Sequence, residues 1–366
     1  MRSSYMEVNL DSFNSNIQEI KKYLGNNIDI MPVVKANGYG THINYRVDIL
    51  NKFKIVAVAI CDEAEFLRKI GYTNEIFCLN QPNVTDIEKI VENNITIGIS
   101  SKEFLKEVLN IKEKITVHLE IETGMGRTGI SQEELEEFIE YIRNSSNIFV
   151  EGIYTHFSVA DTDYEYTENQ INKFNKAIKF VENKMGKLKY IHAAASNGIL
   201  NFKNSYFNLV RPGIIIYGYE SFEGAKEKIN LKPVSRLIST ISFIKTMKKG
   251  ESISYGRKYI AEDEIKVATI PIGYADGIRR EYFKDGYVVI NNIRAKIIGS
   301  ICMDSFMVDI TNIPDARVGD TVYIWDNEII KLDEIAKKLN TINYEIISTI
   351  STRVPRVFVK EGEKDV

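Results

Sequence analysis

The stretch DIMPVVKANGYG (29–40) is an apolar run that ends in a lysine and continues into small, turn-forming residues. Its β-branched and apolar residues are typical of a buried strand. Burying an ammonium group is costly unless the group has a charged partner or a covalent role. Lys35, at the end of this predicted strand, is therefore the first candidate for chemistry.

Runs of the same kind recur along the chain and alternate with amphipathic helical patterns. The predicted strands are 29–36, 54–60, 75–80, 95–100, 115–122, 149–157, 190–196 and 209–218. Helical patterns occupy 62–70, 101–110, 131–144 and 166–185. Eight such repeats within about 220 residues predict an α/β fold, a closed (β/α)8 TIM-type barrel.

The pattern changes near residue 230. From 231 to 366, strand-forming runs are punctuated by Gly, Asp and Asn, and a helical pattern appears only around 331–348. We predict a barrel domain at 1–230 and a mostly antiparallel β domain at 231–366. A strand at about 5–9 precedes the barrel, and pairing with the C-terminal domain is one arrangement open to it.

Composition excludes several classes of function. The chain has 366 residues, 44% of them hydrophobic, and its 47 basic and 50 acidic side chains give a formal charge of -3. No basic stretch is dense enough for nucleic acid, and no metal-ligand spacing is present. Cys61, Cys78 and Cys302 are odd in number and widely spaced, which favours reduced thiols in the cytoplasm. The sequence has no 18-residue apolar run, and its first residues do not resemble a signal peptide.

Barrels carry their chemistry at the C-terminal ends of their strands. One mouth should therefore bring together several polar residues, namely Lys35, Arg127, His156, Ser196 and the segment 211–213. A lysine there can be an ion-pair member, a phosphate-binding charge or an amine nucleophile. The segments AASNG (194–198) and RPGII (211–215) are turns if taken singly. Together they offer Ser196, Gly213 and the Ile214 amide to a phosphate, so pyridoxal phosphate fits the set.

Eight strings follow the order and spacing of the alanine racemase family, and this resemblance spans nearly the whole chain. They are VVKANGYG, ETGMGRTGI, THFSVAD, VRPGI, SYGRKY, PIGYADG, ICMD and ISTRVPR. The resemblance implies a pyridoxal-phosphate-dependent amino-acid racemase that supplies D-amino acids for peptidoglycan precursors. It also implies a homodimer with composite sites and a small amino-acid substrate.

The resemblance assigns the cofactor contacts. Lys35 corresponds to the lysine that holds the cofactor covalently and acts as the base on the D side. The phosphate contacts correspond to Tyr39, Ser196, Gly213 and Ile214. Arg211 corresponds to the arginine at the pyridine nitrogen. A guanidinium keeps its proton, so the ring nitrogen stays unprotonated, which favours racemisation over transamination.

The resemblance also assigns the substrate side. Tyr255 corresponds to a second base, supplied by the partner subunit, and His156 to the imidazole that hydrogen-bonds it. Arg127 corresponds to the arginine that steers the substrate carboxylate. The remaining predicted substrate contacts are the Met303 amide, Tyr274 and Thr352. By contrast, His42, His118 and His192 are predicted to be structural.

The sequence departs from the family at four positions. Glu120 replaces a lysine that many members carbamylate, and we expect its carboxylate to orient Arg127 unless it simply faces solvent. Ala195 replaces an asparagine, and Ser300 replaces an arginine, which should widen the entrance.

The fourth departure is Thr352, which stands where the family usually has a cofactor-contacting tyrosine. The smaller hydroxyl opens space that suits serine, although one such contact discriminates by only about 1 to 3 kcal/mol. Vancomycin-resistance serine racemases also lack this tyrosine, and their racemase half follows a membrane-spanning half. That origin would explain the abrupt start at MRSSY, so alanine, serine or both stay open as substrates.

Two alternative functions are considered for a barrel that binds pyridoxal phosphate. A pyridoxal-phosphate decarboxylase of the same architecture would normally place an acid, rather than Arg211, at the ring nitrogen. A non-catalytic cofactor-binding barrel would lack the β domain and any counterpart of Tyr255.

Overall fold

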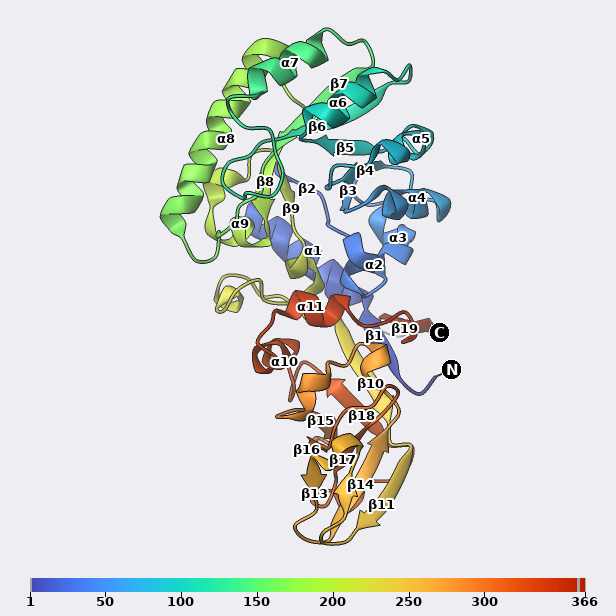
Figure 1. Ribbon diagram of the computed structural model, residues 1–366. Coiled ribbons are helices and arrows are strands. Elements are labelled where there is room, and N and C mark those ends of the chain that lie inside the picture. Colours follow the sequence, from blue (N-terminus) through green and yellow to red (C-terminus); the bar gives the residue numbers. More distant parts are fainter. Residues whose placement is uncertain (1, 361–362, 366) are drawn as a thin grey trace.

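The computed structural model describes residues 2–360 and 363–365. A helix-covered barrel and an elongated β domain lie end to end, with helix α11 (Asn343–Ser348) between them (Figure 1). The two ends of the chain lie close together near this junction.

Eight parallel strands form the barrel, as predicted. They are β2 (Asp29–Ile30), β3 (Ile55–Val58), β4 (Glu75–Cys78), β5 (Thr96–Ile99), β6 (Ile115–Glu120), β7 (Ile148–Tyr154), β8 (Tyr190–Ala195) and β9 (Leu209–Arg211). Their order is β2-β9-β8-β7-β6-β5-β4-β3, and a bridge between Val33 and Ala57 joins the two ends of the sheet. The barrel is therefore closed by backbone pairing.

Two barrel strands are much shorter than their apolar runs. Within the predicted strand 29–36 the regular strand covers only Asp29–Ile30, although the Met31 and Val33 amides still donate to carbonyls of the β9 segment. The predicted strand 209–218 ends at Arg211. Pro32 and Pro212 follow these ends, and proline has no amide to donate to a ladder. Past Pro212 the chain turns into the 3-10 helix η4 (Ile214–Tyr217). The chain therefore leaves the sheet soon after Arg211, whereas the segment after Ile30 stays hydrogen-bonded up to Val34 at the mouth of the barrel.

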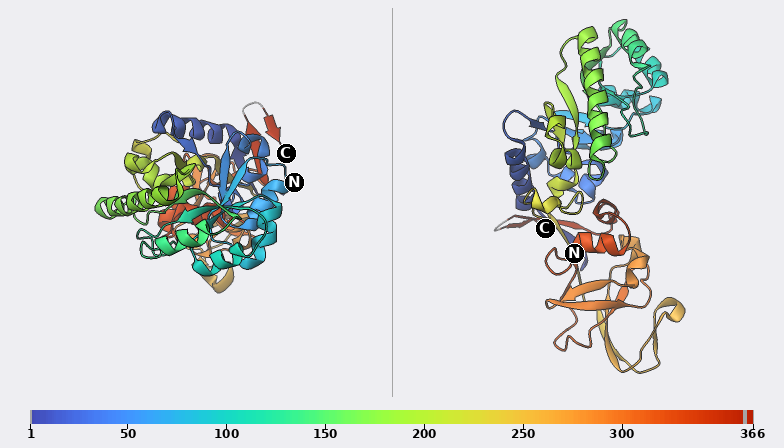
Figure 2. Two further views of the ribbon diagram at one scale, coloured as in Figure 1. Left: turned by 90° about the horizontal axis from the view of Figure 1, so that it is seen from above. Right: turned by 90° about the vertical axis from the view of Figure 1, so that its left-hand side faces the viewer.

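Helices surround the barrel strands (Figure 2). They are α1 (Leu10–Leu24), α3 (Val47–Leu50), α4 (Cys61–Lys69), α5 (Ile87–Glu92), α6 (Lys102–Leu109), α7 (Leu135–Arg143), α8 (Tyr164–Met185) and α9 (Ser196–Asn201). The Ser101 and Asp163 side chains cap α6 and α8, as expected for short polar residues before an apolar pattern. The predicted helix 131–144 is regular only from Leu135, and Ser131 and Glu134 cap the turn before it with reciprocal hydrogen bonds.

A ten-stranded, mostly antiparallel sheet forms the second domain, as predicted. Its order is β11-β14-β17-β16-β15-β18-β10-β1-β19-β20. The bounds are β1 (Tyr5–Asn9), β10 (Ser235–Thr240), β11 (Phe243–Met247), β14 (Ile265–Ile270), β15 (Tyr287–Ile290), β16 (Ile293–Ile298), β17 (Phe306–Asp309), β18 (Thr321–Trp325), β19 (Arg356–Lys360) and β20 (Glu363–Asp365). The N-terminal strand β1 pairs antiparallel with β10 and parallel with β19, so it lies inside this C-terminal sheet.

Smaller elements complete the β domain. The strands β12 (Ser252–Ile253) and β13 (Tyr259–Ile260) form a separate hairpin, and α10 (Leu332–Lys338) packs beside α11. Within the described part of the chain, no helix has the length and apolar character needed to cross a membrane.

Candidate active site

One cavity of about 560 Å³ opens at the C-terminal ends of the barrel strands. Seven residues predicted from the sequence line it, namely Lys35, Tyr39, Arg127, His156, Ser196, Arg211 and Gly213. They come from five different strand ends, so it is the barrel closure that brings them together.

Lys35 begins a short turn of left-handed helix, α2 (Lys35–Tyr39). Ala36, Asn37, Gly38 and Tyr39 all have φ between 52° and 59°. Such angles cost non-glycine residues roughly 1 to 2 kcal/mol each, so the surroundings must impose them. Gly38 is needed for a further reason, because a Cβ there would lie 2.8 Å from the Ile43 side chain.

Glu63, on α4, holds this turn in place. Its Oε1 accepts the Ala36 amide at 2.6 Å, and its Oε2 accepts the Ala59 amide at 2.7 Å. One carboxylate therefore joins the Lys35 turn to the end of β3. Sequence reasoning did not identify Glu63, because its acidic residue type at a helix start is fully explained by the helix dipole.

The amine of Lys35 is half-buried, and no described residue forms a hydrogen bond or ion pair with it. Burial lowers its pKa below that of free lysine, and the charges of Arg127 and Arg211 lower it further, against the opposing charge of Glu63. A lysine with a lowered pKa has more of the neutral, nucleophilic amine at neutral pH.

A polar cradle lies at another side of the cavity. Ser196 starts α9 and accepts the Gly213 amide on its Oγ at 3.1 Å. A Cβ at Gly213 would lie 2.5 Å from the Tyr39 hydroxyl and 3.8 Å from the Ser196 Oγ. The missing side chain thus leaves room beside the Tyr39 and Ser196 hydroxyls, and this combination suits a phosphate.

Arg211 is 2% exposed and occupies the floor of the cavity. Its Nη2 donates to the carbonyls of Thr155 at 2.8 Å and Ala193 at 3.1 Å, and its Nη1 contacts His192 Nδ1 at 2.7 Å. Burial lowers the pKa of Arg211 to about 10, which still leaves it charged at neutral pH. No described residue accepts from its Nε, so this donor is open to a ligand.

Two buried histidines extend from Arg211 into the barrel. Because the guanidinium can only donate, His192 Nδ1 must accept, so the proton of neutral His192 sits on Nε2. That Nε2 lies 2.9 Å from His118 Nδ1, which places the His118 proton on Nε2 in turn. The arginine therefore sets both tautomers, and the histidines predicted to be merely structural support a cavity residue directly.

His156 follows β7 and shares the same arginine. Its Nδ1 lies 3.3 Å from Arg211 Nη2 and must accept that contact, which leaves its proton on Nε2. Burial, with the charges of Arg211, Arg127 and Lys35, lowers the pKa of His156 to about 3. The imidazole is neutral and offers an N–H toward the cavity.

Arg127 lies in the 123–129 loop above the mouth, and Glu120 lies below it at the end of β6. Glu122 accepts the amides of Gly124 and Gly126 and shapes the loop. Glu120 is buried rather than solvent-facing, and its Oε1 accepts the Thr128 hydroxyl at 2.9 Å. The Glu120 carboxylate therefore hydrogen-bonds to Thr128, next to Arg127, and interacts with the Arg127 guanidinium by charge attraction. Burial raises the pKa of Glu120, although Thr128, Tyr154 and Arg127 oppose this rise.

Six predicted site residues do not line this cavity. Ile214 and Glu120 are buried in the barrel domain, and the other four belong to the β domain. Tyr255 is 72% exposed, Met303 52% and Tyr274 42%, and Thr352 is also exposed. Tyr255 is the first residue of the 3-10 turn η6 (Tyr255–Arg257). Its backbone carbonyl accepts a hydrogen bond from the Ser300 hydroxyl at 3.1 Å. The described chain presents these side chains outward.

Helix α11 supplies a part of the cavity wall that sequence reasoning missed. Tyr344 and Ser348 line the cavity, and the Tyr344 ring lies 6.1 Å from the Tyr39 ring. The amphipathic helical pattern at 331–348 was visible in the sequence, but nothing in it placed this helix across the barrel mouth.

Pyridoxal phosphate, predicted from the sequence, fits the residues present. The cavity combines a half-buried amine at Lys35, a phosphate cradle at Ser196 and Gly213, and the free Nε donor of Arg211. These match the aldehyde, the phosphate and the ring nitrogen of that cofactor, one group each.

Comparisons with known proteins agree over the whole chain. The family model described as alanine racemase, N-terminal domain, matches residues 8–221, and that for the alanine racemase C-terminal domain matches 234–358. Alanine racemase from Methanococcus maripaludis is 38% identical over 97% of this chain and 98% of its own length. Alanine racemase 1 from Clostridium acetobutylicum is 37% identical over 99% of this chain and 97% of its own.

Solved structures give the same result. The alanine racemase of Clostridium difficile 630 superposes with a TM-score of 0.95 at 34% identity, covering 100% of this chain and 98% of that one. The alanine racemase of Bacillus anthracis, solved with bound L-Ala-P, gives a TM-score of 0.93 at 32% identity and covers 100% and 97%.

Proposed function

The chain belongs to the pyridoxal-phosphate-dependent alanine racemase family, and on that premise we propose that it interconverts the L and D forms of alanine and serine with two bases on opposite faces of the α-carbon. The single observation that carries the proposal is the cavity in which Lys35, Arg211 and the Ser196–Gly213 cradle face one another. When bound, pyridoxal phosphate supplies the electron sink that makes an α-proton acidic.

Arg211 favours proton exchange over other reactions of this cofactor. Its Nε can donate to a ring nitrogen, and a guanidinium with a pKa of about 10 keeps its own proton at neutral pH. His192 and two carbonyls hold it from behind, so it is fixed before a ligand arrives. This observation speaks against the decarboxylase alternative, which would need a proton on that nitrogen.

Lys35 is the proposed base on the D side. Its lowered pKa favours the neutral amine that receives a proton, and the ammonium formed can return that proton. Arg127, exposed on its loop at the cavity edge, is placed to bind the substrate carboxylate. Glu120, buried below the loop, is proposed to orient it without carbamylation.

The second base is proposed to be Tyr255 of a second copy. Its 72% exposure, and its absence from the cavity of its own chain, support a role across a homodimer interface. The N–H of His156 Nε2 would then stabilise the phenolate of that tyrosine. Met303 and Tyr274, exposed on the same domain, would contact the substrate in the same partner site.

Serine is proposed as a second substrate beside alanine. The support is the small hydroxyl of Thr352, in the turn just after α11, together with the Ser348 hydroxyl on the cavity wall. A supply of D-amino acids to peptidoglycan precursors is the proposed biological use of these products.

The deciding experiment follows loss of the α-proton from L-alanine and L-serine in deuterated water, with the cofactor-loaded protein. Exchange accompanied by the D product supports racemisation. If neither amino acid exchanges its α-proton, the racemase proposal is wrong and the chain is a cofactor-binding barrel. Release of carbon dioxide instead would identify the decarboxylase.

A Thr352→Tyr variant tests the serine proposal separately. Refilling the space with a phenol should lower kcat/KM for serine relative to alanine by about 10-fold or more. Thr321→Tyr, a change of the same size at an exposed threonine of β18 outside the cavity, is the matched control. An unchanged substrate ratio in Thr352→Tyr removes the basis for naming serine.

A further inference from the structure

Asp276 is a buried carboxylate outside the cavity, and it ends the turn that carries Tyr274. It closes η7 (Tyr274–Asp276), and its side chain is 0% exposed. Its Oδ2 accepts the Gly273 amide at 3.0 Å, and its backbone carbonyl accepts the Ser351 amide at 3.1 Å. This residue shapes its own turn and joins it to the segment after α11.

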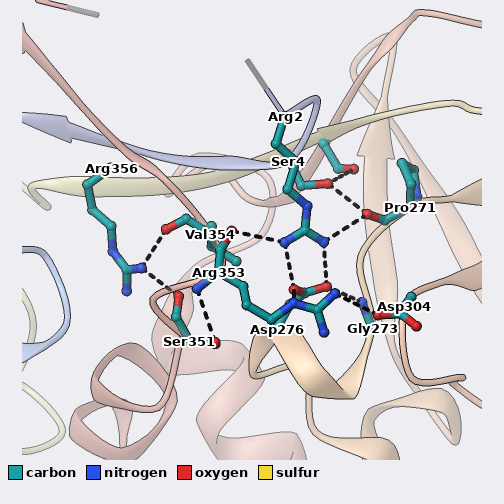
Figure 3. A network of polar contacts seen from close by, with 11 residues as sticks. Arg2, Ser4, Pro271, Gly273, Asp276, Asp304, Ser351, Arg353, Val354 and Arg356 are labelled. Atoms are coloured by element: carbon teal, nitrogen blue, oxygen red, sulfur yellow. Dashed lines mark hydrogen bonds and ion pairs between the residues drawn. The ribbon is translucent and has the colours of Figure 1, made fainter.

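The cation that pairs with this carboxylate is Arg2, from the N-terminus. Its Nη1 donates to Asp276 Oδ1 and its Nη2 to Oδ2, both at 2.7 Å (Figure 3). The same guanidinium donates to the carbonyls of Arg353 at 3.1 Å and Pro271 at 3.4 Å. A bidentate pair with two further acceptors fixes the orientation of both partners, unlike a single surface ion pair.

Other charges nearby cannot replace Arg2. Arg353 Nε lies 3.6 Å from Asp276 Oδ1, but its Nη2 is already engaged with Asp304 at 2.7 Å, and its side chain is 49% exposed. Burial pushes the pKa of Asp276 up, and the hydrogen bonds from Arg2 and Gly273 with the charge of Arg353 bring it below its usual value. Without Arg2 the carboxylate would keep its burial and lose its principal partner.

The proposed substrate contacts of the β domain adjoin this network. Tyr274 lies two residues before Asp276, Met303 immediately precedes Asp304, and Thr352 immediately precedes Arg353.

Backbone bonds tie the same loops together. The Tyr274 amide donates to the Cys302 carbonyl, and the Ala275 amide donates to the Met303 carbonyl, each at 3.0 Å. A Cβ on Gly273 would lie 2.4 Å from both of those carbonyl oxygens, so the two loops are in direct contact. A shift of the Asp276 turn must therefore move the Met303 loop as well.

We infer that Arg2 is a positioning residue for the substrate end of the active site. By fixing the Asp276 turn, it sets where Tyr274 and the Met303 amide are presented. The inference rests on the proposed function, because these groups act on a substrate only in the proposed composite site. It assigns a role in substrate binding to a residue far from Lys35 in sequence and outside the cavity.

A purely structural reading is that Arg2 only anchors the N-terminal strand. The chain offers a matched control for this reading, since Arg236 pairs with Glu7 of β1 at 3.6 Å and is 44% exposed. Arg236 also tethers β1, and among the described residues none of the loops around Asp276 forms a hydrogen bond or ion pair with its side chain.

The experiment compares Arg2→Ala, Arg2→Lys and Arg236→Ala as cofactor-loaded proteins. Arg2→Ala should raise KM for L-alanine about tenfold while kcat changes less, because the loss lies in positioning. Arg2→Lys, which keeps the charge without the bidentate fork, should fall between Arg2→Ala and wild type. Arg236→Ala should leave KM unchanged.

Hydrogen–deuterium exchange supplies a readout independent of turnover. In Arg2→Ala, amides of 271–278 and 301–305 should exchange faster than in wild type and in Arg236→Ala. Equal effects of Arg2→Ala and Arg236→Ala on KM and exchange, or a lower melting temperature alone, would overturn the inference. Should Arg2→Ala fail to fold, Arg2→Lys decides by the same two measurements. If wild type does not racemise alanine, the proposed function fails, whereas the exchange result still reports on the Asp276 turn.

Discussion

The barrel mouth and the exposed edge of the β domain hold two halves of the proposed chemistry, and they are built in opposite ways. At the barrel mouth, Arg211 is 2% exposed and held by three neighbours, and its histidine partners are buried in turn. On the β domain, Tyr255 is 72% exposed, and the residue before it, Ser254, has a φ of 63°. The first half is assembled within one chain, whereas the second is proposed to act in another copy.

The largest effect should come from breaking the barrel half. Lys35→Ala removes both the covalent attachment and one base, so alanine racemisation should fall by at least about 10³-fold. The visible absorption of covalently held cofactor should disappear as well. Lys54→Ala, at an exposed ion pair with Asp29, is the control and should keep both signals. Retained activity in Lys35→Ala would remove the barrel half from the chemistry.

The next largest effect tests whether the β-domain half acts on a second copy. Tyr255→Phe removes one proton-transfer group and should cost about 10²- to 10⁴-fold. Mixing Lys35→Ala chains with Tyr255→Phe chains should restore about a quarter of wild-type activity, since half of the dimers are mixed and each has one intact site.

Chains that carry both substitutions are the control for this mixing test. Mixed with Lys35→Ala chains, they should restore nothing, because no intact site can form. If the first mixture also stays inactive although mixed dimers form, Tyr255 does not act in trans.

A smaller effect is expected at Glu120, within the barrel half. Glu120→Gln keeps the shape and removes the charge, so KM for L-alanine should rise several-fold, up to about tenfold, as Arg127 loses its nearby anion. Activity should not depend on added bicarbonate in either protein. Unchanged kinetics in Glu120→Gln would refute the orienting role. Glu122→Gln, on the adjacent loop, separates loss of charge from loss of loop shape.

The smallest effect concerns how the stability of the barrel and of the β domain depends on pH. All four histidines lie in the barrel, and burial lowers the pKa of both His118 and His156 to about 3. Unfolded histidine titrates near 6.5, so below that pH the unfolded chain binds protons that the native chain does not. Native stability should therefore decline as the pH falls from about 6.5, by up to about 1.4 kcal/mol per pH unit for each such histidine.

Urea unfolding at pH 7, 6 and 5 checks this prediction. Far-ultraviolet circular dichroism follows the helical barrel, and Trp325, the single tryptophan, buried in β18, follows the β domain. The barrel signal should lose stability with acid more steeply than the Trp325 signal. His118→Phe should flatten the barrel slope, and an unchanged slope would contradict a neutral, buried His118.

Much of the fold could be predicted because periodicity reports burial directly. All eight barrel runs form strands, since each buries an apolar segment between helices. The strand ends were harder to predict, because the chain turns into η4 soon after Pro212, inside a run that remains apolar. The left-handed turn at Ala36–Tyr39 could not be predicted, since Ala36 and Tyr39 rarely adopt positive φ, and the Glu63 carboxylate that holds the Ala36 amide is distant in sequence.

The candidate site also contains residues that the sequence predicts and residues that it does not. Lys35, Ser196 and Gly213 follow strand ends, so barrel topology alone brings them together. His118, His192 and Arg2 were missed because their roles depend on which atoms face them, and spacing contains no such information.

The position of β1 has a consequence for how the protein is made and divided. Tyr5–Asn9 are synthesised well before their partners at residues 235–240 and 356–360. Within this sheet the strand stays unpaired until β10 has emerged, and its second edge stays open until β19 has emerged. A fragment expressed from residue 231 onward would lack the strand between β10 and β19, and its two bare edges would invite aggregation.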